Sequence, residues 1–239
     1  MKKENISPFE FSGLLLVDKP SAMTSHDVVA VIKKKFNIRK VGHCGTLDPS
    51  ATGLLLILIG HATKLSSILS EKEKIYDVVM QLGIETNTYD LDGKIIIEKK
   101  VPHISTDEIH TIFQNFIGEI TQIPPMFSAC KKEGKKLYEL ARKGITVERK
   151  KRLIRINWIN IKKIEIPFIY FSIKCSKGTY VRSICHDIGQ QIGCGAAMKS
   201  LRRIKSGDYS VKDAFNLETI KTWTQRDLLY ALKDPFNEF

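Results

Sequence analysis

The sequence lacks the features that mark secreted, membrane-spanning and zinc-stabilised proteins. Its longest apolar run is residues 54–59, far short of the roughly 20 residues that a spanning helix needs. The N-terminal residues MKKENISPFEF have no apolar core of a secretory signal. The five cysteines are odd in number and never form Cys-x-x-Cys, so neither disulfides nor a structural zinc site are expected. We therefore expect reduced thiols and a cytoplasmic protein.

Motifs for nucleotide cofactors and for metal-assisted hydrolysis are also missing. There is no Walker A loop and no Gly-x-Gly-x-x-Gly motif. No His-x-x-x-His or Asp-x-Asp pattern lies near the loop that looks most like a catalytic one, so paired-carboxylate and metal-assisted chemistry are not indicated. We expect no cofactor and no metal ion.

Positive charge, by contrast, is abundant and concentrated. The 239 residues include 38 Lys and Arg against 26 Asp and Glu, which gives a net charge of +12. Residues 131–155 alone hold eleven basic and three acidic side chains. A solvated helix face would explain such a run, and so would a surface that binds phosphates with release of their counterions. The density of like charge favours a polyanionic partner, with an anionic membrane surface as the competitor.

The apolar pattern predicts strands at several places along the chain. Uninterrupted or alternating apolar residues indicate strands at 13–17, 54–59 and 74–82. The stretch 153–175 is rich in Ile and Phe and is broken at Pro167, which suggests two further strands.

Helices are expected between some of these strands. Thr24 and Asp27 form a capping-box pattern ahead of helical spacing. Helical spacing recurs over 106–117, and again after Gly178 up to a stop at Gly193. Strands and helices mix without strict alternation, which favours an α+β fold.

Residues 42–53 (GHCGTLDPSATG) look most like a catalytic loop. Glycines and a proline give a stiff, tightly turned backbone that leads into an apolar strand. Asp48 precedes Pro49 and is biased to an extended conformation. A carboxylate fixed at a strand edge suits catalysis, although an Asp before Pro is also a common turn former. We expect the whole of residues 41–53 to be a loop.

Six ordered blocks of sequence resemble the TruB-type tRNA pseudouridine synthase family, bacterial enzymes that modify the T-loop. The blocks are VDKPSAMTS (17–25), GHCGTLDPSATG (42–53), KIY (74–76), IPPMFSACKKEGKKLYELARKG (123–144), SKGTYVRSI (176–184) and LRRIKSG (201–207). The resemblance covers about residues 13–210. It implies an α+β fold with a mixed, largely antiparallel central sheet flanked by helices, and a basic RNA-clasping insertion at about 124–155.

The resemblance also implies a division of the chain. Residues 1–215 would form the catalytic domain, and 216–239 a short tail in which Asn216 caps one helix. We find no room after residue 215 for the PUA-type RNA-binding domain that many relatives carry. Weaker tRNA affinity, or greater reliance on the basic insertion, would follow.

By resemblance, the chain is an isomerase that converts uridine to pseudouridine at position 55 of the tRNA T-loop. The N1–C1′ bond breaks, the uracil rotates and C5 joins the ribose, without a redox step. Asp48 would be the catalytic carboxylate, and whether it attacks the ribose or removes a ribose proton stays open. The base must leave its stack, and Tyr76 matches the tyrosine on which it would stack. Lys19 and Pro20 are expected to be scaffold for the loop.

Other site residues follow from matching motifs. Arg182 would hold Asp48 ionised from the first turn of a helix capped by Thr179. Tyr180 shares that motif, His43 would contact the flipped nucleotide, and Leu201 would wall the uracil pocket. The RNA backbone would be bound by Lys131, Lys132, Arg142, Arg149, Lys150, Lys151 and Arg152. Each also has a plainer reading, such as a surface arginine, a strand tyrosine, a backbone-bonded histidine or a packed leucine.

Two other functions remain open. A non-catalytic tRNA-binding or tRNA-folding factor would use the basic insertion alone. A guide-RNA-dependent relative would act within a larger particle. The expected partner is the T-arm of tRNA, and we expect a monomer with no metal and no membrane partner.

Overall fold

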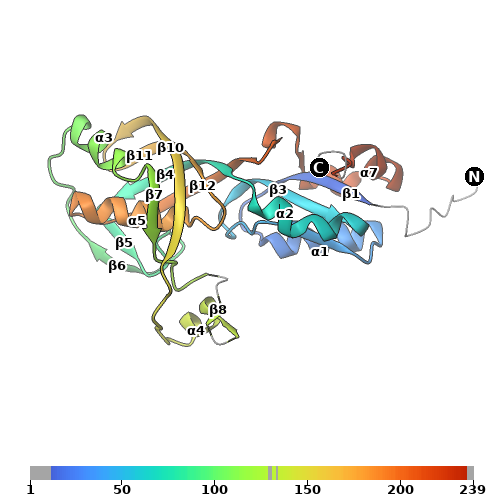
Figure 1. Ribbon diagram of the computed structural model, residues 1–239, viewed down its shortest axis with the longest axis horizontal. Coiled ribbons are helices and arrows are strands. Elements are labelled where there is room, and N and C mark those ends of the chain that lie inside the picture. Colours follow the sequence, from blue (N-terminus) through green and yellow to red (C-terminus); the bar gives the residue numbers. More distant parts are fainter. Residues whose placement is uncertain (1–11, 129–130, 133, 236–239) are drawn as a thin grey trace, which may run out of the picture. The chain divides into compact units, whose positions relative to one another are not determined.

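The computed structural model describes residues 12–128, 131–132 and 134–235 (Figure 1). The chain forms two compact units. Unit 1 comprises the chain up to Lys74 together with the segment from Arg202 onward, and unit 2 comprises Ile75–Leu201. Strand β12 (Ala196–Ser206) runs from unit 2 into unit 1. No helix among the described residues is long and apolar enough to cross a membrane.

Unit 1 contains a mixed sheet with the strand order β14-β1-β3-β12. Strands β1 and β2 pair with β3 antiparallel, whereas β14 pairs with β1, and β12 with β3, in parallel. Its elements are β1 (Gly13–Lys19), α1 (Ser25–Phe36), β2 (Val41–Cys44), β3 (Thr52–Ile59), η1 (Gly60–Leu65), α2 (Ser66–Glu71), β13 (Tyr209–Ser210), η2 (Val211–Asp213), β14 (Phe215–Asn216), α6 (Leu217–Thr222) and α7 (Gln225–Ala231).

Two apolar clusters bury both faces of this sheet. On one face, α1, α6 and α7 pack through side chains such as Ile32, Ile220 and Leu228. On the other face, η1 and α2 pack through Ala62 and Leu69. Strand β3 contributes to both clusters, which explains why its sequence is a continuous apolar run rather than an alternating one.

Unit 2 contains a second set of strands, in the order β12-β4-β11-β10-β7. Strands β7, β10 and β11 are antiparallel neighbours. Helix α5 runs across these strands (Figure 1), and Phe113 of α3 packs edge-on against Phe171 of β11. The elements are β4 (Lys74–Leu82), β5 (Ile84–Thr86), β6 (Ile95–Glu98), α3 (Thr106–Gln114), β7 (Gly118–Gln122), β8 (Lys131–Lys132), β9 (Lys135–Lys136), α4 (Leu137–Arg142), β10 (Arg152–Glu165), β11 (Phe168–Cys175) and α5 (Val181–Ile192).

The α+β class and the mixed, largely antiparallel sheet flanked by helices are confirmed. The strands expected at 13–17, 54–59 and 74–82 are β1, β3 and β4, and the stretch around Pro167 forms β10 and β11. The capping box of Thr24 and Asp27 is present at α1. Helix α5 ends at Gly193, whose left-handed backbone caps it. The domain division at residue 215 stays a prediction.

Three expectations about local structure are wrong. Residues 41–44 form strand β2 instead of a loop, because they pair with β3, a partner that local composition does not reveal. The helix expected over 106–117 is α3, which ends at Gln114 instead. The N–H groups of the next three residues bond to carbonyls three residues back, a tighter turn than that of an α-helix. The tail holds two helices, because Thr224 caps α7 after Asn216 has capped α6.

The cap of α5 also differs from the expected one. Tyr180, not Thr179, is the N-cap residue. The Thr179 hydroxyl donates to the Ser176 carbonyl instead, so it is occupied by the preceding turn. Arg182 nevertheless lies in the first turn of the helix, as expected.

Candidate functional site

The loop that carries Asp48 joins β2 to β3 in unit 1. Gly45 and Gly53 lie near its ends and have positive φ values of 74° and 98°. A Cβ at Gly53 would lie 2.3 Å from the backbone oxygen of Arg203, so the close approach of these backbones requires glycine. The half-buried Asp48 accepts a hydrogen bond from the Ala51 N–H at its carbonyl, which closes a turn around it.

Lys19, a fully buried cation, holds the middle of this loop. Its Nζ donates to the Pro49 carbonyl at 3.0 Å, directly after Asp48, and to the carbonyls of Pro20 and Met23. Burial lowers the pKa of Lys19 to about 8, and the charge of Asp48 opposes that shift. These contacts agree with the scaffold role expected of Lys19.

Arg203, a second buried cation, holds both ends of the loop. Its side chain is 1% exposed. Nε donates to the Leu54 carbonyl at 2.6 Å, and Nη2 donates to the Gly45 carbonyl at 3.0 Å. The rigid fork of a guanidinium suits two acceptors in fixed positions. Sequence reasoning missed Arg203, although its position two residues after Leu201, on the same face of β12, was a signal.

The N-terminus of α1 contacts the loop on another side. The buried Ser25 hydroxyl accepts from the Leu47 N–H at 2.9 Å and donates to the Leu47 carbonyl at 3.2 Å. The Ser21 hydroxyl donates to the Ser50 carbonyl. The backbone on both sides of Asp48 is therefore fixed before any substrate binds.

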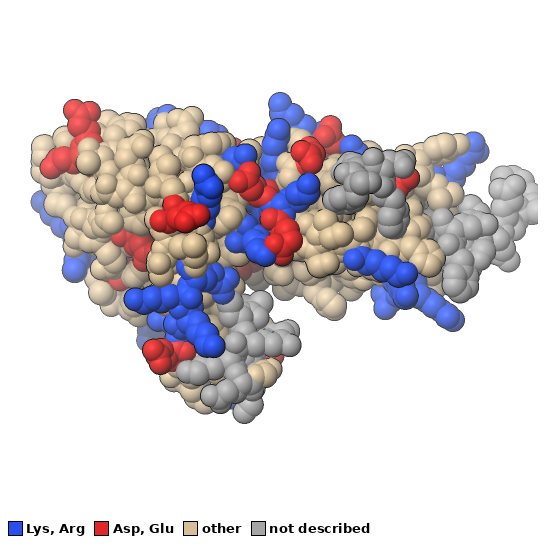
Figure 2. All heavy atoms as spheres, viewed as in Figure 1, with Lys and Arg blue, Asp and Glu red and all other residues tan. Residues whose placement is uncertain are grey.

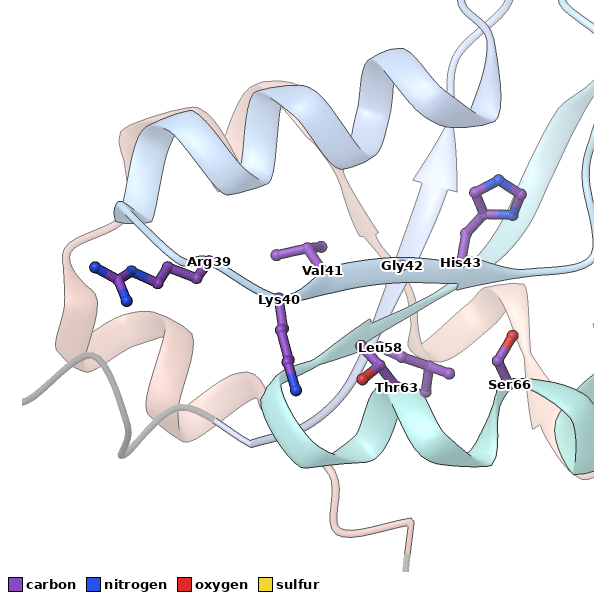
Figure 3. Close-up of a pocket in the computed structure, with 8 residues that line it drawn as sticks. All are labelled: Arg39, Lys40, Val41, Gly42, His43, Leu58, Thr63 and Ser66. Atoms are coloured by element: carbon purple, nitrogen blue, oxygen red, sulfur yellow. The ribbon is translucent and has the colours of Figure 1, made fainter.

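His43 lies on β2, just ahead of the Asp48 loop, and lines an open pocket of about 420 Å³. Figure 3 shows Lys40 pointing to the side where Thr63 and Ser66 lie, with the His43 ring on the other side of the strand. Burial, followed by the charge of Arg203, lowers the pKa of His43. Its Nδ1 is buried without a hydrogen-bond partner in the described part of the chain. The Lys40 ammonium suits a phosphate oxygen, whereas the Thr63 hydroxyl already donates to the Gly60 carbonyl at 2.8 Å.

Arg182 is the centre of a polar cluster in unit 2. Its side chain is 4% exposed. Nη1 donates to the Thr88 carbonyl at 2.9 Å, and Nη2 donates to the Phe127 carbonyl at 2.6 Å. The carboxylate of Asp90 lies 3.7 Å from Nη1. Fixed acceptors on several sides orient this guanidinium.

Sequence reasoning missed Asp90. It lies in the polar turn between β5 and β6, and its Oδ1 accepts from the Thr88 hydroxyl at 2.6 Å. Its backbone bridges to Met198 of β12. Polar residues between apolar strands usually indicate only a turn, so no local pattern separates Asp90 from its neighbours.

Tyr180 joins the start of α5 to the end of β7. Its N–H donates to Gln122 Oε1 at 2.8 Å, and Gln122 Nε2 donates to its carbonyl at 3.0 Å. The guanidinium carbons of Arg152 and Arg182 lie 5.2 Å and 5.7 Å from the centre of its ring. The negative π face of a tyrosine attracts cations at such distances, so Arg152 and Arg182 help to hold the Tyr180 ring in place.

The other expected pocket residues of unit 2 lie on buried faces of strands. Tyr76 is 8% exposed and lies on the same buried face of β4 as Val78, two residues further along. Leu201 is 9% exposed in β12. The burial of Tyr76 and Leu201 agrees with packing in the core, and the small exposed part of each side chain could also contact a base.

Basic side chains gather where β10 begins and where the segment of α4 lies (Figure 2). Lys150 and Lys151 are exposed. Arg149 donates to the Pro124 carbonyl at 3.2 Å, and Arg152 donates to the Gly178 carbonyl at 3.1 Å. The side chains of Lys131, Lys132 and Arg142 lie outside the described part of the structure.

The expected site residues thus divide between the two units. Unit 1 holds His43 and Asp48, while unit 2 holds Tyr76, Tyr180, Arg182, Leu201 and the basic residues. In the described ranges, no group of three or more His, Cys, Asp or Glu side chains could hold a metal ion. Four cysteines are free and buried, and Cys130 lies outside the described residues.

Family models match nearly the whole chain. Residues 33–181 match the TruB family pseudouridylate synthase N-terminal domain, and residues 182–234 match the tRNA pseudouridylate synthase B C-terminal domain. The chain is 50% identical to tRNA pseudouridine synthase B of Alkaliphilus oremlandii, over 94% of this chain and 75% of that protein. It is 49% identical to the protein of the same name from Chlamydia abortus, over 83% of this chain and 84% of that protein.

Two solved structures with the same fold are a Cbf5-Nop10-Gar1 complex and an H/ACA RNP. A chain from a Cbf5-Nop10-Gar1 complex superimposes with a TM-score of 0.73 at 29% identity, and this chain covers 60% of it. A chain from an H/ACA RNP bound to a substrate RNA gives 0.67 at 28% identity, with 53% of that chain covered. The present chain spans about half to three fifths of their length. From the family models and the identities to its relatives, the chain belongs to the TruB family of pseudouridylate synthases.

Proposed function

We propose that the protein isomerises uridine to pseudouridine at position 55 in the T-loop of tRNA. The activity is supported by the family and by relatives named tRNA pseudouridine synthase B at 50% and 49% identity. The observation that carries the proposal is the Asp48 loop, tied through its carbonyls by the buried Lys19 and Arg203. An acid held this firmly needs little reorganisation when the nucleoside arrives.

Asp48 is the catalytic carboxylate in this proposal. It either adds to the ribose or removes a ribose proton, so that the N1–C1′ bond breaks. The freed uracil rotates, C5 bonds to C1′, and the proton lost from C5 is balanced by one gained at N1. No electron acceptor or donor enters this scheme.

Arg182 is proposed to keep Asp48 ionised, since a neighbouring positive charge favours a carboxylate over its protonated form. This role is supported by the way Arg182 is held, with the Thr88 and Phe127 carbonyls fixing the direction of its guanidinium.

The RNA partner is proposed to be the T-arm of tRNA, and the protein to act in the cytoplasm as a monomer. A flipped uracil would stack on Tyr76 beside Tyr180 and Leu201, with His43 contacting the nucleotide. The exposed Lys150 and Lys151 support a contact with stem phosphates. The proposed backbone-binding set also includes Lys131, Lys132, Arg142, Arg149 and Arg152.

The decisive test is Asp48→Asn, incubated with tRNA that carries a tritium label at C5 of uridine. We expect release of the label to fall below detection while the affinity for tRNA stays unchanged. Asp208→Asn, the same change at an exposed aspartate of unit 1, is expected to react normally. Release at the wild-type rate by Asp48→Asn would remove Asp48 from its role.

The basic insertion also supports one alternative function, that of a tRNA-binding or tRNA-folding factor without catalysis. That function predicts that Asp48→Asn leaves function intact while loss of the exposed lysines abolishes it. A guide-RNA-dependent enzyme would fail on bare tRNA. Turnover of bare tRNA by the purified wild-type chain therefore separates both alternatives from the proposed enzyme.

A further inference from the structure

Two aromatic rings of unit 2 stack at a place that the proposed chemistry does not use. The ring centroids of Tyr89 and His186 lie 4.0 Å apart, and the ring planes differ by 13°. Tyr89 belongs to the turn between β5 and β6, and His186 lies on α5. The stack therefore joins this turn to that helix.

The same turn and the same helix also meet at Arg182. The guanidinium binds the Thr88 carbonyl and lies 3.7 Å from the Asp90 carboxylate. Arg182 and His186 are four residues apart on α5 and so lie on one face of the helix. Tyr89 stands between Thr88 and Asp90, so the stack holds the centre of the segment that binds the guanidinium.

The backbone of Tyr89 is unusual for the side chain that it carries. Its φ of 67° is left-handed, a conformation that favours glycine. The backbone is tied on both sides, since its N–H donates to the Thr86 carbonyl and its carbonyl accepts from the Met198 N–H at 2.9 Å. A tyrosine in this conformation carries backbone strain that a favourable contact must offset, and the stack of its ring on His186 is such a contact.

His186 is suited to stacking as a neutral ring. Burial lowers the pKa of His186, while the charge of Glu85 opposes that shift and Arg149 reinforces it. Nδ1 is buried, has no hydrogen-bond partner in the described ranges, and lies 3.8 Å from the Glu85 carboxylate. No hydrogen bond at Nδ1 fixes the ring in the described ranges, and the stack with Tyr89 is a direct contact that orients it.

We propose that Tyr89 and His186 are positioning residues for Arg182, because their stack holds the turn that presents Thr88 and Asp90 to the guanidinium. The inference rests on the role proposed above for Arg182. Without the stack, the turn samples other arrangements and the guanidinium loses its fixed acceptors. The rate of isomerisation then falls, whereas RNA affinity is kept, since the exposed lysines are unchanged.

Tyr89→Gly tests this directly, because glycine accepts the left-handed backbone and the whole stacked side chain is removed. We expect its single-turnover rate at saturating enzyme to fall about 10- to 100-fold, as for a small misplacement of a reacting group. The Kd for tRNA should stay within about twofold, since every lysine that binds a phosphate is kept. Tyr89→Phe and His186→Phe keep two stacked rings and should stay within about threefold of the wild-type rate.

Three controls make the outcomes distinct. Asn37→Gly makes the same backbone change at a left-handed residue of unit 1 and should change neither rate nor Kd. Circular dichroism melting shows that each variant is folded at the assay temperature. If Tyr89→Gly does not fold, His186→Ala compared with His186→Phe makes the same distinction.

Asp48→Asn, assayed in parallel, separates this inference from the proposed function. An active Asp48→Asn would overturn the proposed function whatever the stack does. An inactive Asp48→Asn beside a Tyr89→Gly that reacts at the wild-type rate would overturn the positioning role alone. Equal losses in Tyr89→Gly and Tyr89→Phe, or a loss seen in Kd and not in rate, would also overturn it.

Discussion

Lys19 is a buried cation whose ionisation the fold has changed. Its pKa in the folded chain is about 8, against 10.5 for an ordinary lysine. Between these two values the unfolded chain binds a proton that the folded chain has released. Unfolding then takes up a proton, so the contribution of Lys19 to the free energy of unfolding rises with pH across this interval and is lost as pH falls through 8.

We therefore expect Lys19→Met to remove part of the pH dependence of stability. Urea unfolding of the wild type and the variant at pH 7.5 and 9.5 measures it. The stability gap between wild type and variant should widen at the higher pH, because methionine does not titrate. The exposed Lys34→Met serves as control and should run parallel to the wild type. A Lys19→Met profile that is also parallel would contradict the shifted pKa.

Single residues differ in how far sequence could have found them. Asp48 and Arg182 stand in motifs of fixed spacing, so the resemblance to the family was enough to propose them as site residues. Arg203 lies in a strand, where charge usually indicates an exposed face, and only its place on the same face as Leu201 indicated burial. Asp90 and Tyr89 lie in a polar turn, and their contacts with α5 come from pairing of distant segments.

Helix α1 offers a matched pair of neighbouring residues at its N-terminus. Thr24 caps the helix, whereas Ser25 binds both backbone groups of Leu47 in the Asp48 loop. Loss of the cap in Thr24→Ala should cost about 1 kcal/mol of stability. The rate should be unchanged, since the cap does not touch the loop.

Ser25→Ala should instead slow the reaction about tenfold, because the backbone next to Asp48 loses its anchor. Urea unfolding and single-turnover label release measure the two effects in both variants. A Ser25→Ala variant that loses stability but reacts at the wild-type rate would show that the loop is fixed without α1.

Among the helices and strands, those defined by neighbouring residues were predicted correctly, and those that depend on distant partners were not. The apolar alternation of β4 and the cap of α1 lie within a few residues, so their bounds were found. Strand β2 was missed because its apolar content is low and its partner, β3, supplies the hydrophobic contacts. The cap of α5 was misplaced by one residue because Gln122, from another strand, binds the backbone of Tyr180.

The charge of the whole molecule sets how tRNA binding should respond to salt. With a net charge of +12, affinity should fall steeply as ionic strength rises. Replacing Lys150 and Lys151 with alanine should lower the slope of log Kd against log salt by about two, because each lysine neutralises one phosphate. The single-turnover rate at saturating enzyme should stay unchanged.

Lys99 and Lys100 supply the control, because they are another adjacent pair of exposed lysines in unit 2. Their replacement with alanine should leave the slope as in the wild type. Titrations of labelled tRNA at several salt concentrations measure all three proteins. Equal slopes in both double variants would remove the basic insertion from the RNA-binding surface.

Unit 1 is built from both ends of the chain, with all of unit 2 between them. A ribosome making this protein releases β1, α1 and the Asp48 loop before unit 2, but Arg203 and helices α6 and α7 after it. Because domains tend to fold as they emerge, unit 2 gains its core first. The carbonyls of Gly45 and Leu54 therefore have no Arg203 guanidinium to bind until all of unit 2 has been made. The nascent chain therefore acquires a fixed Asp48 loop only after unit 2 has emerged, and a product that stops within unit 2 would lack it.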